Sequence, residues 1–559
     1  MIKFVLSISL SKKPVGLLDL FEVKPDIELY YNETEYECVV WGDPITTNNF
    51  SEELRKNNSV EYILYNIHGH FYYMYLNKIS GELYIGNSLF SILPVYYFKN
   101  DNSIVLSENA FFLGDYLALN KINKKFILET LLFNYPLFDN SVIDGVILLP
   151  SNSYILISNG KVLVKKHTFI EDFFEEKPLP WKKSAEMMTD IFIETVEKYL
   201  PDTHYASSLT GGFDGRTLTA AGLYYKKDFS VYSFGSKDSK DISIAEKLSR
   251  HANIPFIKIM LDEDYINKSN IECGEEFIIN SSGTATFARA HYLFAAKKLS
   301  SEFKHIITGN FGSEIFRAAH IAGVVISKNL YNIFNSETPE KAFDLIETSP
   351  EFNCLNEDLQ KKEWELLKED ILKLPCFNRT YNNLTLNQKF YLFVFEELFR
   401  KYFGAEIVNQ FKCLKNRTPF LDIEFLKALF KTEIAGIYSE FFEHNPFKRY
   451  KGQVFYTHVI RKAYPDFGKI MTDKDYKPDD LINIFGKFNI LEGYLKQKVF
   501  KKEICHDPFS VNNAWEANKE YWLKIPASKE LFNLGNNNLC IDKEILFRIL
   551  SLSYIADKF

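Results

Sequence analysis

The chain has 559 residues, of which 46% are hydrophobic and 25% charged, and this length predicts roughly two to four domains that each bury a core without disulfides. Its 66 Lys and Arg against 73 Asp and Glu give a net charge of −7, so no basic surface for nucleic acid is expected. The seven cysteines include no C-x-x-C spacing, and no apolar run approaches the roughly 18 residues that span a bilayer, so we expect a cytoplasmic protein without a zinc site or membrane contact.

Residues 1 to about 170 have the pattern of short strands separated by turns. Apolar side chains recur at every second position of 4–10, which predicts a first strand rather than an export signal. The segment 61–65 also predicts a strand, and Asn159-Gly160 between alternating apolar runs predicts a β-hairpin. We therefore expect a β-rich, meander-like region.

The pattern changes at 171–181, where charged residues and prolines become dense, and helical spacing begins at Ser184. From 205 to 308, strand-like runs alternate with helical patterns, which predicts a parallel sheet covered by helices on both faces. From about residue 330 the chain is predicted to be mostly helical. We therefore predict two domains, 1–175 and 176–559.

The segment 208–216 (Ser-Leu-Thr-Gly-Gly-Phe-Asp-Gly-Arg) follows a predicted strand and opens a predicted helix. Gly211 and Gly212 can turn backbone N–H groups inward as an anion nest, with the positive end of the helix behind them. Asp214 beside such a nest can hold Mg²⁺. Taken alone, the segment fits better a tight strand-to-helix turn that Asp214 caps. The motifs further along the chain remove that preference.

The rest of the chain supplies these motifs in order. They are 232–235 (Tyr-Ser-Phe-Gly), 308–316 (Thr-Gly-Asn-Phe-Gly-Ser-Glu-Ile-Phe), 417–422 (Arg-Thr-Pro-Phe-Leu-Asp) and 458–461 (His-Val-Ile-Arg) with Tyr464-Pro465. Together with the loop at 208–216, they resemble the motifs of the asparagine synthetase family, which includes β-lactam synthetases and lasso-peptide cyclases. The resemblance covers nearly the whole chain, because 94–97, 107–108 and 145–150 echo the glutaminase-like domain of that family.

The resemblance implies an α+β domain like the β-sandwich of N-terminal-nucleophile hydrolases over 1–175, and an α/β pyrophosphate-loop ATPase with a parallel sheet and a helical C-terminal part over 176–559. It implies ATP and Mg²⁺, adenylation of a carboxylate with release of pyrophosphate, and attack by an amine. The implied ATP and pyrophosphate contacts are Ser208, Leu209, Thr210, Gly211, Gly212, Asp214, Gly215, Arg216, Ser233, Phe234, Gly235, Thr308 and Gly309. The implied Mg²⁺ ligands are Asp214, Ser313 and Glu314. Arg216 is expected to contact phosphate, since Gly215 replaces a serine of the family and loses its hydroxyl.

The second loop departs from the family pattern. Asn310 stands where the family has a glutamate that assists acyl transfer, and a neutral amide cannot act as a general base. Ser313 stands where the family has an aspartate that helps to bind Mg²⁺. The family's transition-state lysine has no direct match, so the basic residues upstream of the late helix are candidates, with a solvated basic loop as the alternative. The predicted catalytic residues are Glu314, Asn310, Lys451 and Arg449.

The N-terminal region lacks the family's glutaminase nucleophile. Residue 2 is Ile2, and the nearest cysteine, Cys38, lies in a strand-like segment. No thiolate is therefore expected for glutamine hydrolysis, as in β-lactam synthetases. The attacking amine must then be free ammonia or an amine carried by the substrate or by a second substrate.

We therefore predict an ATP- and Mg²⁺-dependent amide-forming ligase for a small-molecule or peptide carboxylate and an amine, in a peptide, natural-product or glycan modification pathway. A second copy of the chain or a pathway protein is a further predicted partner. One alternative is a nucleotide-binding scaffold that has lost its chemistry at Asn310 and Ser313. Another is ammonia-dependent asparagine synthesis, although 282–289 departs from the asparagine synthetase pattern where relatives contact the acidic substrate.

Overall fold

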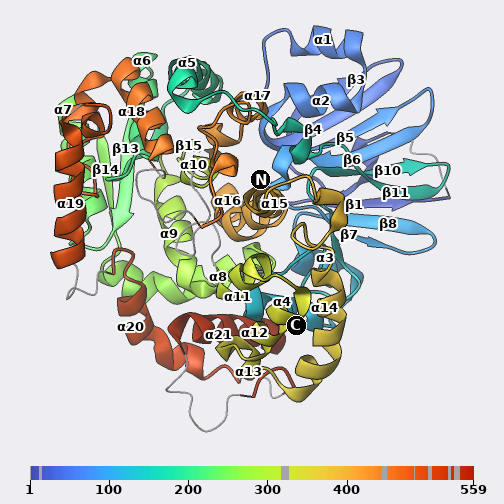
Figure 1. The fold of residues 1–559 in the computed structure, drawn as a ribbon. Coiled ribbons are helices and arrows are strands. Elements are labelled where there is room, and N and C mark those ends of the chain that lie inside the picture. Colours follow the sequence, from blue (N-terminus) through green and yellow to red (C-terminus); the bar gives the residue numbers. More distant parts are fainter. Residues whose placement is uncertain are drawn as a thin grey trace.

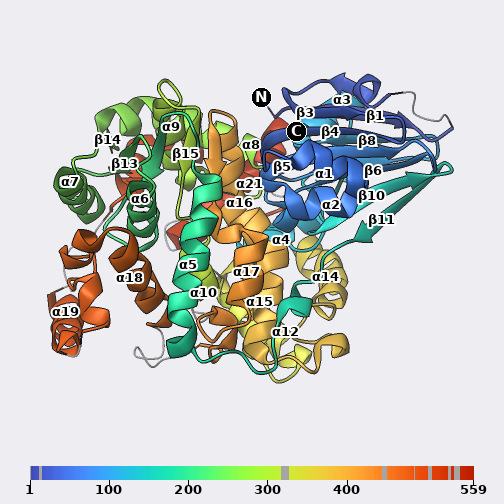
Figure 2. The same ribbon diagram turned by 90° about the horizontal axis from the view of Figure 1, so that it is seen from above.

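A computed structural model describes residues 2–11, 16–316, 327–442, 450–483, 485–500, 507–526, 530–533 and 542–559. The early strands lie on one side of the molecule, and a later sheet with most of the helices lies on the other (Figures 1 and 2).

The N-terminal region contains two antiparallel sheets, with strand orders β2-β1-β8-β7-β9 and β11-β10-β6-β5-β4-β3 (Figure 1). Their strands are β1 Val5–Ser9, β2 Phe21–Val23, β3 Ile27–Asn32, β4 Tyr36–Ile45, β5 His68–Asn77, β6 Glu82–Asn87, β7 Tyr96–Lys99, β8 Ser103–Ser107, β9 Ile147–Leu148, β10 Ser153–Ser158 and β11 Lys161–Lys166. The sheets share a core, in which the ring of Phe4, just before β1, lies 5.2 Å from that of Trp41 on β4. The predicted β-rich region is confirmed, and its sheets are antiparallel.

Two local predictions in this region had opposite outcomes. The hairpin at Asn159-Gly160 is confirmed, since β10 and β11 pair antiparallel and both turn residues have positive φ, 50° and 72°. The predicted strand at 61–65 is wrong, because the segment belongs to a helix, α2 Val60–Asn66. Ser59 caps this helix by accepting a hydrogen bond from the Tyr62 N–H at 3.2 Å, and a short apolar run does not distinguish a buried helix from a strand.

The later sheet is parallel throughout, in the order β14-β13-β12-β15-β16. Its strands are β12 Tyr205–Ser208, β13 Phe229–Gly235, β14 Phe256–Met260, β15 His305–Ile307 and β16 Lys415–Arg417. Helices α6 and α7 cover one face and α9 covers the other (Figure 2). The predicted parallel sheet with helices on both faces is confirmed.

The remaining helices build the C-terminal part and the connections. The helices are α1 Phe50–Asn57, α3 Ala110–Leu117, α4 Lys124–Phe133, α5 Trp181–Tyr199, α6 Asp214–Tyr224, α7 Lys240–Ala252, α8 Asn270–Asn280, α9 Ala290–Leu299, α10 Gly312–Phe316, α11 Lys328–Asn335, α12 Pro339–Glu347, α13 Pro350–Asn353, α14 Trp364–Ile371, α15 Leu386–Phe393, the π-helix η9 Val394–Phe403, α16 Gly404–Phe411, α17 Ile423–Leu429, α18 Lys451–Ala463, α19 Gly486–Phe500, α20 Val511–Leu523 and α21 Lys543–Lys558. Among the described residues, every helix is too short or too polar to cross a membrane.

The motif at 417–422 joins the two sheet regions. Arg417 donates from Nε and Nη2 to the Asp43 carboxylate at 2.8 and 3.2 Å, and His68 Nδ1 lies 2.8 Å from Asp422. Burial alone would raise the pKa of Asp43, but hydrogen bonds from His305 and Arg417 and the positive charge of Arg417 hold it well below its usual range. The contact therefore depends on a buried, ionised carboxylate.

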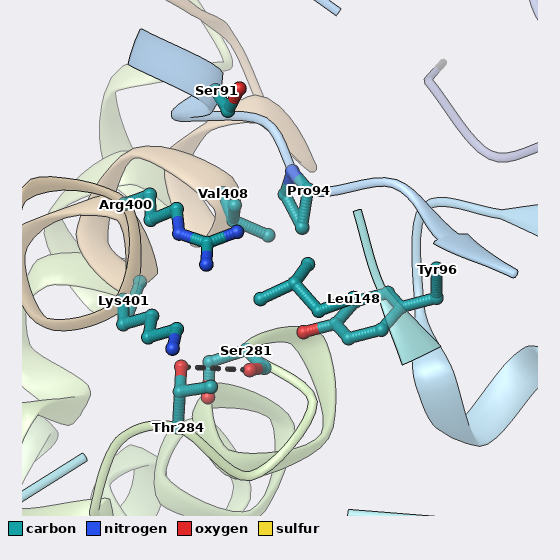
Figure 3. A pocket seen from close by; sticks show the side chains of 10 residues that line it. Ser91, Pro94, Tyr96, Leu148, Ser281, Thr284, Arg400, Lys401 and Val408 are labelled. Carbon is teal, nitrogen blue, oxygen red and sulfur yellow. Dashed lines mark hydrogen bonds between the residues drawn. The ribbon is translucent and has the colours of Figure 1, made fainter. Parts of the chain in front are cut away.

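A second contact joins the early strands to η9 and α16 (Figure 3). Arg400, 6% exposed, donates from Nη1 to the Leu149 carbonyl at 2.7 Å, and the buried Lys401 donates to the Phe138 carbonyl and pairs with Glu397. The space left between these side chains is about 10 Å³, at the lower limit for one water molecule. Side chains therefore fill this contact.

Candidate active site

A cavity of about 310 Å³, here called the first cavity, opens at the carboxyl ends of β12, β13 and β15. From β12 the chain continues to β13 and β14 on one side and returns to β15 on the other, so the cavity lies where the strand order reverses. Parallel sheets bind ligands at this position. Eleven of the predicted residues line the cavity: Ser208, Thr210, Asp214, Gly215, Ser233, Phe234, Thr308, Gly309, Asn310, Ser313 and Glu314.

Asp214 is held between the two motif loops, 208–216 and 308–316. Ser313 Oγ donates to Asp214 Oδ2 at 2.7 Å, while Oδ1 is buried and has no hydrogen-bond partner among the described residues. The loops approach so closely that a Cβ added at Gly309 would lie 2.6 Å from the Cβ of Asp214. Glycine at 309 is therefore what allows the second loop to reach Asp214.

The acidic residues fit a magnesium ion that completes its coordination with other ligands. Asp214 and Glu314 both line the cavity, and the buried Oδ1 of Asp214 is an oxygen ligand without a partner in the part of the chain that is described. The described residues contain no group of three or more His, Cys, Asp or Glu placed to hold a metal. Mg²⁺ commonly takes one or two carboxylates together with phosphate oxygens and water, which matches this donor set.

The glycine-rich loop differs from the expected open nest. Neither Gly211 nor Gly212 has a positive φ, and their N–H groups donate to Asp241 Oδ1 at 3.0 Å and to Thr210 Oγ1 at 3.2 Å. The first turn of α6 has no side-chain cap, which leaves the kind of N–H groups that anions bind. A phosphate would therefore meet the first turn of α6, and would reach the two glycine N–H groups only by replacing Asp241 and Thr210.

Arg216 is not placed for the phosphate contact that we predicted. Its side chain is fully buried and donates to three backbone carbonyls, those of Phe467 at 3.1 Å, Ile470 at 2.7 Å and Met471 at 2.9 Å. Burial lowers the pKa of Arg216 to about 10, so the group stays charged at neutral pH. Arg216 therefore anchors the segment after α18 beneath the loop, and the position of a motif residue alone could not show which way its side chain points.

The other predicted residues do not line the cavity or lie outside the described part of the chain. Leu209, Gly211, Gly212, Gly235 and Lys451 are outside its lining, and Arg449 lies outside the described residues. Lys451 is half-buried and begins α18. A Cβ added at Gly215 would meet the Ser208 carbonyl oxygen at 2.3 Å, so this backbone cannot hold the serine that the family has there.

Sequence reasoning missed a buried carboxylate in the cavity wall. Glu406 of α16 accepts a hydrogen bond from Asn310 Nδ2 at 3.1 Å and pairs with Arg289. It lies 96 residues from Asn310 on a helix without a recognisable motif, so only the fold brings the two together. The remaining lining residues without a predicted role are Tyr232, Asp241, Tyr292, Phe311, Phe403, Gln410 and Phe509.

Aromatic rings line one side of the cavity. The ring centroids of Phe234 and Phe509 are 5.9 Å apart, and His291 stacks on Phe509 at 4.8 Å with an interplanar angle of 2°. Burial lowers the pKa of His291 to about 3, so the imidazole is neutral. A planar aromatic ligand would find stacking partners here.

The N-terminal region offers no reactive thiol near its start. Cys38 is fully buried in β4, where burial raises the pKa of its thiol, and Ile2 is buried as well. A thiol that is buried and protonated is not a nucleophile. Cys38 is therefore not available as a thiolate nucleophile.

Comparisons with known proteins identify no family. No family model matches the chain, and no curated protein matches its sequence. Among solved structures, the chain is similar to a glutamine phosphoribosylpyrophosphate amidotransferase from B. subtilis complexed with ADP and GMP, with 8% identity and a TM-score of 0.15. The match covers 41% of this chain and 47% of that protein, less than half of its length. Similarity at this level carries no argument about function.

Proposed function

We propose that the protein is an ATP-dependent, AMP-forming amide ligase of the asparagine synthetase kind, without glutamine hydrolysis. The observation that carries this proposal is that three segments distant in sequence, 208–215, 232–234 and 308–314, meet around one cavity at the switch point of a parallel sheet. Such a set of loops is typical of nucleotide sites. The resemblance of the motifs to the asparagine synthetase family supplies the reaction type.

Each part of the cavity has a role in this reaction. Asp214 and Glu314 would hold Mg²⁺, which offsets negative charge on the phosphates when it is bound. The aromatic side at Phe234 and Phe509 would take the base of the nucleotide. Glu406, fixed by Asn310, would accept the proton of the attacking amine, which the neutral amide of Asn310 cannot do.

The amine comes from a second substrate in this proposal. The N-terminal region has no exposed thiol to release ammonia from glutamine. The contact in Figure 3 leaves only about 10 Å³ between the early strands and the helices. Delivery of ammonia across this contact is therefore not part of the proposal.

The test is pyrophosphate release from ATP over a panel of carboxylates and amines, with wild type, Asp214→Asn and an exposed control, Asp238→Asn. Asp214→Asn removes a charge from the cavity, so release should fall by at least 100-fold, while Asp238→Asn should match wild type. Equal release by wild type and Asp214→Asn would rule out this site.

A nucleotide-binding scaffold without turnover is the second candidate. It is favoured by one observation, that the N–H groups of Gly211 and Gly212 are already bonded within the protein. Calorimetry with ATP and Mg²⁺ separates the two functions, because tight binding with no pyrophosphate release under any substrate pair supports the scaffold. Steady formation of asparagine from aspartate and ammonia would support the third alternative, an ammonia-dependent asparagine synthetase.

A further inference from the structure

A second cavity, of about 380 Å³, lies beside the first and has no role in the site described above. Its lining comes from the end of α4, the turn and short helix after α8, the end of η9, and α21. Figures 1 and 2 both show α4, α8 and α21 near one another. A cavity of this volume is in the range of sites for small molecules.

One layer of side chains separates the two cavities. Arg289 lines the second cavity and pairs with Glu406, which lines the first. On the second-cavity side, Arg289 Nη1 donates to the Tyr402 carbonyl at 2.7 Å and its Cζ lies 4.4 Å from the Tyr402 ring centroid. On the first-cavity side, Asn310 donates to the same Glu406. Ligands in the two cavities would therefore be separated by a single ion pair.

The lining of the second cavity is suited to a carboxylate. Arg548 is 6% exposed, and burying a guanidinium is costly unless it is paired. Its Nη2 lies 3.4 Å from Glu351 and its Nη1 donates to the Leu131 carbonyl. Together with the Nε bond to the Glu544 carbonyl, these bonds use three of its five N–H groups among the described residues, so donors remain for a ligand.

The opposite charge is present at the same cavity. Glu544, which is exposed, brings a carboxylate to the lining, and Asn134, Thr284 and Thr286 add uncharged polar groups. Two guanidinium groups and one carboxylate around a small space match a molecule that carries both an anionic and a cationic group. An amino acid is the simplest molecule of this kind.

We propose that the second cavity binds the amine-bearing second substrate, and that this substrate is a small amino-acid-like molecule whose carboxylate is held by Arg548. This inference rests on the proposed ligase function. The Arg289–Glu406 pair is then the gate through which the amine reaches the activated carboxyl group. There the amine nitrogen forms the C–N bond as the C–O bond to AMP breaks. AMP leaves with that electron pair, and the surplus proton of the amine passes to Glu406.

The test is calorimetry of the full chain with the twenty amino acids and the carboxamides of those that bind, in the absence of ATP. Removal of the carboxylate should weaken binding at least 10-fold. Ala288→Leu fills part of the second cavity without removing a charge and should also weaken binding at least 10-fold, while Ala517→Leu, at an exposed position of α20, should leave binding unchanged. Arg548→Met removes the guanidinium that is proposed to hold the carboxylate of the ligand. The melting temperature of this variant shows whether it folds.

Two outcomes would overturn the site: no amino acid binds at millimolar concentration, or an amino acid binds wild type and Ala288→Leu equally. Pyrophosphate release tests the proposed ligase function independently of the binding measurement. If amino acids bind as expected but pyrophosphate is never released, the binding site stands and the ligase function falls. If pyrophosphate is released and Ala288→Leu leaves the KM for the amine unchanged, the ligase function stands and the second-cavity site falls.

Discussion

Gly309→Ala tests whether the approach of the two loops, and not the flexibility of glycine, explains why glycine is needed at 309. The added Cβ would lie 2.6 Å from the Asp214 Cβ and 3.2 Å from the Gly215 nitrogen. Carbon atoms pack best at about 3.5–4.0 Å, so one loop must move by roughly 1 Å. Overpacking of this kind costs about 1–3 kcal/mol, which corresponds to a loss of several degrees in melting temperature.

The matched control is Gly212→Ala in the first loop. There an added Cβ meets nothing closer than Thr210 Oγ1 at 3.4 Å, an ordinary contact, and the change should stay within about 1 kcal/mol. Thermal unfolding without ligand compares the two variants, and ATP titration should then show weaker binding for Gly309→Ala because Asp214 and Ser313 are displaced. Equal melting temperatures for the two variants would refute the reasoning.

Three further predictions concern buried charges, and thermal or denaturant unfolding measures each. Arg216→Leu leaves three carbonyls without their donor and should cost about 2–5 kcal/mol, whereas a phosphate-binding role would lower ATP affinity and leave stability unchanged. Asp43→Asn removes the carboxylate that pairs with Arg417, whose side chain is 13% exposed, and should cost about 3–5 kcal/mol at pH 7. The wild-type contribution of Asp43 should be lost as the pH falls below about 4, because its folded pKa is depressed. Burial raises the pKa of Glu129, a fully buried residue of α4, to about 8, so the folded protein keeps a proton that the unfolded chain releases. Stability should therefore fall between about pH 4.5 and 8 by at most about 1.4 kcal/mol per pH unit, and Glu129→Gln should remove that slope; an unchanged slope contradicts the assignment.

The sequence was sufficient to predict the sheets and the loops that carry the site. Alternation of strands and helices implies parallel strands, and loops that follow parallel strands must meet at one edge of the sheet. Ser208, Ser233 and Thr308, which the family resemblance implies as nucleotide contacts, follow three of these strands and line one cavity. The prediction from sequence failed at 61–65, where apolar spacing fits a helix and a strand equally well and a single cap at Ser59 decides the outcome.

The sequence alone could not predict the directions of side chains or the contacts between helices that are distant in the chain. Arg216 lies in the expected loop, but it points into the protein because three carbonyls after α18 are within reach of its guanidinium. Glu406 joins the cavity through the packing of α16, which no local pattern specifies. Both cases depend on tertiary contacts across more than 90 residues.

The two neutral residues of the second loop have related roles in the structure. Ser313 and Asn310 stand where the resemblance leads one to expect carboxylates, and each donates a hydrogen bond to a carboxylate that remains, Asp214 and Glu406 respectively. Two further carboxylates in so small a space would repel these groups unless cations were bound. The hydroxyl of Ser313 and the amide of Asn310 therefore fix the orientation of Asp214 and Glu406. Under the proposed function, Asp214, Glu314 and Glu406 carry the negative charge of the cavity, and the residues at 310 and 313 do not.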